Sequence, residues 1–156
     1  MSLKGLLVVL GLFLSFNVKS NDAVTYNDFL ICWQSLLEEE MLLLGQHIQA
    51  GDEQLAFQQL DSVKSTIARA QICIKERNPY AEAYPLQKAA LEWWSFYEYV
   101  FEYEYPQIIA LSFKDGNHQK QLEGLLKNLQ IAEQVSTFDF RMAQKKFALQ
   151  HQLYLE

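Results

Sequence analysis

The sequence predicts an all-α protein: an antiparallel up-down-up-down four-helix bundle whose last helix is either continuous or split in two. Three observations predict this class. Apolar residues after residue 20 recur at spacings of three and four, which is the helical period. No run of β-branched residues alternates with polar ones, as a strand would require. Only four glycines and three prolines occur in residues 21–156, and short turns therefore join long helical segments.

The first two helices are delimited by capping residues and a glycine. We expect the first helix over residues 25–49, with Thr25 and Asp28 forming a capping box at its start. The second helix is expected to begin after a cap at Asp52 and to end near Arg77. Apolar residues at helical spacing form one stripe on each helix, so the two helices are expected to pack as a hairpin.

The third and fourth helices are delimited by prolines and a second turn. We expect the third helix over residues 85–113, with Pro85 in its first turn and a kink at Pro106. The fourth helical region is expected over residues 118–153. The segment 136–139 (STFD) could cap a separate fifth helix, so one long helix and two shorter ones both remain open.

Length and composition are those of one globular domain. The chain has 156 residues, half of them hydrophobic and 13% aromatic, which excludes a disordered protein. The net charge of -6 argues against nucleic-acid binding, because such proteins need a basic surface to replace counterions. An acidic surface of this kind favours basic partners through electrostatic steering.

The N-terminus has the organisation of a signal peptide. Lys4 precedes an uncharged, mostly apolar stretch over residues 5–16. Val18 and Ser20 are small enough for the positions three and one before a cleavage site, so we expect cleavage after Ser20. A spanning helix needs about 20 apolar residues, so a stable membrane anchor is not expected. The mature domain would be residues 21–156, exported to the periplasm or secreted.

The two cysteines are predicted to form a disulfide. Export places them in an oxidising compartment. Cys32 and Cys73 are nearly equidistant from the turn at Gly51, so in an antiparallel hairpin they should lie at the same height. A bridge would close a loop of about 41 residues and stabilise the fold by roughly 4 kcal/mol in the chain-entropy model. We expect a structural crosslink between the first two helices, provided that both side chains face each other.

The third helix contains an aromatic segment, WWSFYEYVFEYEY, at residues 93–105. One interpretation is that this helix is the most buried of the four. The other is that part of it forms a binding face, because Tyr and Trp are enriched at interface hot spots. Helical geometry places Trp94 and Tyr99 on its flank and solvent side, so their replacement by Ala should not unfold the protein. The residues of this candidate binding face are Trp94, Tyr97, Tyr99, Phe101 and Tyr105.

Four ionisable residues are candidates for a metal site at one end of the bundle. Glu104 falls within the apolar stripe of the third helix, where an isolated carboxylate would be costly. Glu40, His47 and His118 are expected near the same end. The Glu-x-x-His pairs of di-iron bundles are absent, however, so solvated helix ends are the alternative interpretation.

Binding is the function that these features favour. No Gly-x-Ser-x-Gly, P-loop, Gly-x-Gly-x-x-Gly or His-Glu-x-x-His motif is present, so an enzyme is not expected and no cofactor is assigned. We expect an exported binding protein whose partner is another protein, a second copy of itself, or a small apolar ligand beside the third helix. The alternative is an extracytoplasmic metal or haem carrier with ligands at one end of the bundle.

Overall fold

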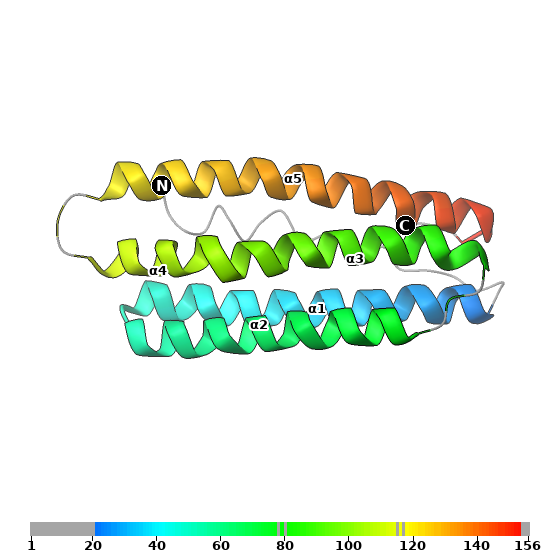
Figure 1. Cartoon of the computed structure of the whole chain (residues 1–156), viewed down its shortest axis with the longest axis horizontal. Coiled ribbons are helices and arrows are strands. Elements are labelled where there is room, and N and C mark those ends of the chain that lie inside the picture. The colour runs from blue at the N-terminus through cyan, green and yellow to red at the C-terminus, as the bar shows by residue number, and fades with distance from the viewer. Residues whose placement is uncertain (1–20, 78, 80, 115, 117, 154–156) are drawn as a thin grey trace.

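The protein is a four-helix bundle in which successive helices run in opposite directions (Figure 1). The computed structural model describes residues 21–77, 79, 81–114, 116 and 118–153, and no strand occurs among them. The elements in chain order are α1 (Asn21–Ala50), α2 (Glu53–Glu76), the 3-10 turn η2 (Ala81–Ala83), α3 (Tyr84–Tyr99), the π-helical segment η3 (Val100–Glu104), α4 (Tyr105–Phe113) and α5 (Gln119–Gln150). The all-α prediction is confirmed, and α3, η3 and α4 together form the third rod of the bundle.

The boundaries of the first hairpin follow the predicted capping at α2 but not at α1. The Asp52 carboxylate accepts a hydrogen bond from the backbone N–H of Leu55 at 2.9 Å, as an N-cap does. α1 already includes Asn21, so Thr25 and Asp28 are interior helical residues and the predicted capping box is wrong. The Thr-x-x-Asp sequence does not start a helix here, because residues 21–24 before it are already helical. The Asp28 side chain is exposed.

A π-helical segment accommodates the proline in the third rod. The backbone N–H of Tyr105 bonds to the carbonyl of Val100, five residues earlier, instead of to the residue four earlier. Pro106 then occupies the first turn of α4, where a proline needs no backbone N–H. The helical path therefore continues to Phe113, as predicted, through a widened turn placed just before Pro106.

α5 is a single helix of 32 residues. The possible cap at residues 136–139 does not interrupt it, since all four residues are helical. Thr137 instead uses its hydroxyl oxygen to accept a hydrogen bond from the indole nitrogen of Trp93 at 3.3 Å. Of the two arrangements left open by the sequence, the continuous helix is therefore the observed one.

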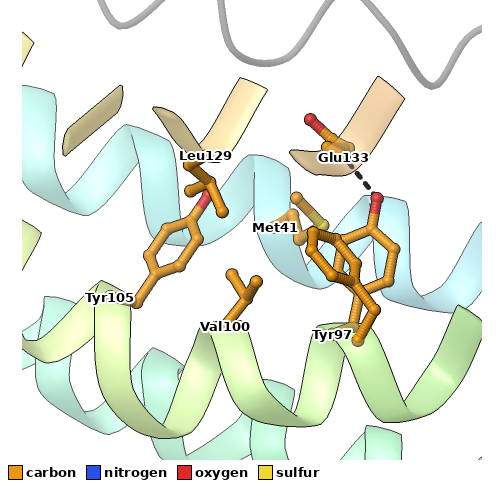
Figure 2. Close-up of a pocket in the computed structure, with 7 residues that line it drawn as sticks. Met41, Tyr97, Val100, Tyr105, Leu129 and Glu133 are labelled. Atoms are coloured by element: carbon orange, nitrogen blue, oxygen red, sulfur yellow. Dashed lines mark hydrogen bonds between the residues drawn. The ribbon is translucent and has the colours of Figure 1, made fainter. Parts of the chain in front are cut away.

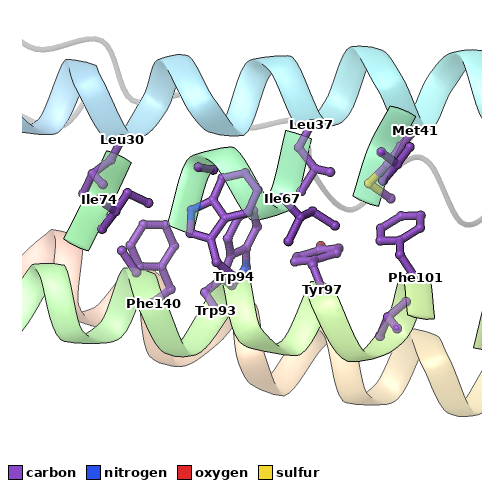
Figure 3. Packing of buried hydrophobic residues seen from close by; sticks show 14 of the residues in the cluster. Leu30, Leu37, Met41, Ile67, Ile74, Trp93, Trp94, Tyr97, Phe101 and Phe140 are labelled. Carbon is purple, nitrogen blue, oxygen red and sulfur yellow. The ribbon is translucent and has the colours of Figure 1, made fainter. Parts of the chain in front are cut away.

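The core is built around the aromatic side chains of α3 and η3. Trp93, Trp94, Tyr97 and Phe101 are each at most 2% exposed. Figure 3 shows these rings lying against aliphatic side chains of α1 and α2 on one side and against Phe140 of α5 on another. The closely packed pairs are α1 with α2, α2 with α3 and α4, and α5 with α3 and α4. α1 and α5 are not among these pairs, although the ring of Tyr26 on α1 lies 6.4 Å from that of Phe147 on α5.

The predicted disulfide is wrong. Both cysteines are free thiols that do not lie near each other; Cys32 is exposed and Cys73 is half-buried. Each residue advances about 100° around a helix, so Cys32, two positions after the buried Leu30, lies on the opposite face of α1. Equal distance from the turn fixes the height of two residues in a hairpin but not their rotation about the helix axes.

The described residues include no helix that is long and apolar enough to cross a membrane. The predicted signal peptide and its cleavage site lie in residues 1–20, outside the described part of the chain.

Candidate functional site

A buried hydrogen bond joins the third and fourth rods of the bundle. The Tyr97 hydroxyl donates to Oε1 of Glu133 at 2.6 Å (Figure 2). Tyr97 is 1% exposed and Glu133 4% exposed. Tyr97 lies in the last turn of α3, and Glu133 lies near the middle of α5. One turn further along α5, Thr137 accepts the hydrogen bond from Trp93 of α3. Polar contacts thus fix the register of α5 against α3.

Burial controls the ionisation of this pair. Loss of solvation raises the pKa of the Glu133 carboxyl, although the hydrogen bond from Tyr97 opposes that rise. Burial and the neighbouring Glu133 carboxylate also raise the pKa values of the Tyr97 and Tyr105 hydroxyls. Both tyrosines therefore stay neutral, and Tyr97 acts as a donor to the carboxylate rather than as an acid.

A small cavity of about 10 Å³ adjoins the pair. Its walls come from α1, α3, η3, α4 and α5, and they are apolar apart from Glu133 and the tyrosine hydroxyls (Figure 2). The lining residues are Met41, Phe96, Tyr97, Val100, Tyr105, Leu129 and Glu133. This volume corresponds to about one water molecule, so the cavity has no room for a small-molecule substrate or ligand.

Glu133 is not among the candidate residues predicted from the sequence. Leu122, Leu125, Leu129 and Ala132 recur at helical spacing in the first half of the last helix, and Glu133 falls beside that stripe. In the structure Glu133 is buried and Ala132 is exposed, so the core-facing stripe lies about one residue further round the helix. Glu104, which the sequence placed in the apolar stripe of the third helix, is half-buried.

Most of the predicted aromatic face is core. Trp94, Phe101 and Tyr105, like Tyr97, are buried, which corrects the prediction that Trp94 lies on the flank. Tyr99 is on the solvent side as predicted, 55% exposed, and its ring lies 5.1 Å from that of the exposed Tyr103. The structure therefore leaves only Tyr99 of the five predicted residues available to a partner.

The predicted metal ligands do not come together. Within the described residues, no group of three or more His, Cys, Asp and Glu side chains could hold a metal ion. The carboxylate and backbone carbonyl of Glu40 both accept hydrogen bonds from the side-chain amide of Gln59 on α2. His47 on α1, Glu104 on η3 and His118 just before α5 are all half-buried. Placing residues at the same end of a bundle is thus not sufficient to make their side chains converge.

Exposed apolar side chains form a second stripe on α5, which we call the outer stripe. It consists of five side chains that are 50–69% exposed: Ile131, Val135, Phe138, Met142 and Leu149. The first four are separated by four, three and four residues, and Leu149 continues the pattern two turns later. This spacing keeps the side chains within an arc of about 60°, roughly opposite the buried face of α5. The spacing of these residues is visible in the sequence, but it is the same spacing that core residues have. The sequence alone therefore does not distinguish the outer stripe from a buried face.

The edges of the outer stripe are mostly basic. Lys127 and Arg141 border one side, Lys146 with Asp139 borders the other, and Lys145 occupies the seam position between Met142 and Leu149; all five are exposed. α5 carries five of the eleven Lys and Arg residues that follow residue 20, whereas only three of the nineteen acids lie on it. The outer stripe is therefore a local basic surface on an otherwise acidic protein.

Comparison with protein-family models, curated proteins and solved structures finds no match to this chain.

Proposed function

We propose that this chain is a binding module without catalytic activity, and that it docks a helix of another protein on the outer stripe of α5. The observation that carries this proposal is the exposure of five large apolar side chains along one line of a well-packed helix. A helix that is apolar on two opposite faces normally buries both of them. The inner face of α5 is buried against α3 and α4, which leaves the outer stripe for a partner.

The dimensions of the outer stripe suit a helical partner. Its five side chains expose on the order of 500 Å², compared with about 800 Å² for one side of a standard protein interface. Contacts from the bordering residues would supply the remainder. Spacings of four and three over three helical turns are those of a coiled-coil seam, in which each side chain inserts between residues of a facing helix. A narrow seam matches a helix better than it matches a flat surface.

The interior of the bundle offers less support for a ligand-binding role. The cavity beside Glu133 holds about one water molecule, and the aromatic rings of α3 are packed against each other and against their neighbours. The outer stripe is therefore a stronger basis for a function than a ligand bound inside the bundle.

Photo-crosslinking tests the proposed docking surface. A photoreactive phenylalanine analogue at position 138, in cells that express the chain, should give an adduct of one defined mass. Adding Val135→Glu to the same protein should abolish it, since a charge would then interrupt the outer stripe. The matched control carries the analogue at Ile72, which is 53% exposed on α2. Equal adducts from both positions, or an adduct insensitive to Val135→Glu, would contradict the proposal.

Export of the mature chain is part of the proposal and rests on the N-terminal sequence. Lys4, the apolar residues 5–16 and the small residues Val18 and Ser20 support it. The intact mass of protein recovered from the extracytoplasmic fraction should correspond to residues 21–156. Recovery of the uncleaved chain from the cytoplasm alone would contradict export and leave the docking surface to be judged separately.

A further inference from the structure

Cations outnumber acids beside the outer stripe. Two ion pairs, Lys64 with Glu102 and Lys88 with Glu92, are on other elements. Lys127, Arg141, Lys145 and Lys146 take part in neither pair, and all four are exposed. Four exposed cations thus lie in or beside the apolar seam, against Asp139 at its border and the half-buried Glu123 four residues before Lys127.

In a helix pair, residues that border the seam select the partner. Opposite charges across these borders are favourable, whereas like charges are unfavourable and exclude partners. A helix with acidic residues on both sides of its own apolar seam would therefore complement α5. On this basis, and resting on the proposed function, we infer that the partner of the outer stripe is an amphipathic helix with acidic borders, supplied by a different protein.

Two other occupants fit the charge or the shape less well. A second copy of α5 would bring basic borders together, and in a parallel pair Lys145 would face its own counterpart. An anionic membrane would match the charge, but helices that lie in a bilayer interface bury a broad apolar face. The outer stripe covers an arc of only about 60°. Seam width and border charge together favour the acidic helix.

Two synthetic peptides provide a direct test. Both would have Ile and Leu at the seam positions of four heptads; one carries Glu at all border positions and the other carries Lys. Fluorescence anisotropy with residues 21–156 should show at least tenfold tighter binding of the Glu peptide at low ionic strength. The difference should shrink as salt is added, because the border charges are exposed and screened.

A charge exchange on the protein makes the test specific. Arg141→Glu combined with Lys146→Glu should weaken binding of the Glu peptide and strengthen binding of the Lys peptide. The control is Lys75→Glu combined with Lys114→Glu, which makes the same change in net charge at two exposed positions away from α5. The control protein should keep the preference for the Glu peptide to within about a factor of two.

The outcomes separate this inference from the proposed function. If both peptides bind equally, and both are lost on Phe138→Glu, the outer stripe docks helices but the acidic partner is wrong. If neither peptide binds, the docking function itself fails. Sedimentation that shows a dimer of the chain dissociated by Phe138→Glu would identify a second copy as the occupant and overturn the inference. Binding to vesicles of anionic phospholipid without binding to either peptide would overturn both proposals.

Discussion

The Tyr97 hydroxyl donates a 2.6 Å hydrogen bond to the Glu133 carboxylate inside the bundle, where both side chains are almost fully buried. A buried carboxylate that loses its donor keeps its desolvation cost without compensation. We therefore expect Tyr97→Phe to lower the free energy of unfolding by about 1–3 kcal/mol at neutral pH, measured by urea denaturation. Tyr103→Phe, which removes an exposed hydroxyl, is the control and should change it by less than about 0.5 kcal/mol. Equal losses from both variants would contradict the structural role of the pair.

Glu38 should make the protein less stable as the pH rises. Burial raises the pKa of its carboxyl from 4.5 to about 7, so the folded state holds this proton more tightly than the unfolded state does. The resulting stability is fully present below about pH 4.5 and is lost as the pH rises through about 7. Burial also raises the pKa of the Glu133 carboxyl, so Glu133 contributes a pH dependence of the same sign.

Urea unfolding at pH 5 and pH 8 checks this dependence. The loss of stability between the two values should be smaller in Glu38→Gln than in the wild type. Glu39→Gln at the exposed neighbouring position should behave as the wild type does. If Glu38→Gln lost as much stability as the wild type over this range, the raised pKa of the Glu38 carboxyl would not be coupled to folding.

Trp94 and Tyr99 should respond oppositely to replacement by Ala. Trp94 is 1% exposed and its ring packs edge-on against Trp93 at 5.2 Å, so truncation leaves a large cavity. We expect Trp94→Ala to cost about 3–5 kcal/mol, a large share of the stability of a domain this size. Tyr99→Ala removes an exposed ring and should cost less than about 1 kcal/mol. Thermal unfolding followed by circular dichroism distinguishes the two, and a tolerated Trp94→Ala would place that ring outside the core.

Both cysteines should be titratable without reductant. Two thiols per chain are expected with a thiol reagent, Cys32 reacting rapidly because it is exposed and Cys73 more slowly because it is half-buried. The double variant Cys32→Ser, Cys73→Ser should unfold at nearly the same urea concentration as the wild type. A native disulfide would instead make the variant less stable by roughly 4 kcal/mol. Detection of fewer than two thiols after unfolding would contradict the structure.

The π-helical segment should tolerate loss of one residue once Pro106 is replaced. Residues 100–104 contain one residue more than a regular α-helical path needs, so deleting the exposed Tyr103 leaves the core face of α4 in place. Pro106→Ala supplies the N–H that a regular helix requires. The matched control deletes the exposed Ser65 from α2 and rotates every later core residue by about 100°. Circular dichroism and urea unfolding should show a folded first protein and a strongly destabilised second one.

Helix positions were largely predictable from local sequence. Asp52 caps α2 as expected, and the third rod continues past Pro106 to Phe113. These features depend on residues within a few positions of one another. The Asp52 carboxylate, for example, accepts a hydrogen bond from the N–H of Leu55, three residues later. The exceptions are also local in origin, since a Thr-x-x-Asp pattern occurs inside α1 and a π turn relieves the proline without a break.

The sequence by itself determined that the chain forms long amphipathic helices joined by short turns, because apolar spacing and capping act between near neighbours. The tertiary structure decided how far each helix is rotated about its axis. That rotation turned Cys32 outward, buried Trp94 and Glu133, kept Glu40 away from the predicted metal ligands, and exposed the outer stripe of α5. The rotation of each helix depends on how the side chains of all four helices fill one core, and those side chains come from residues far apart in the sequence.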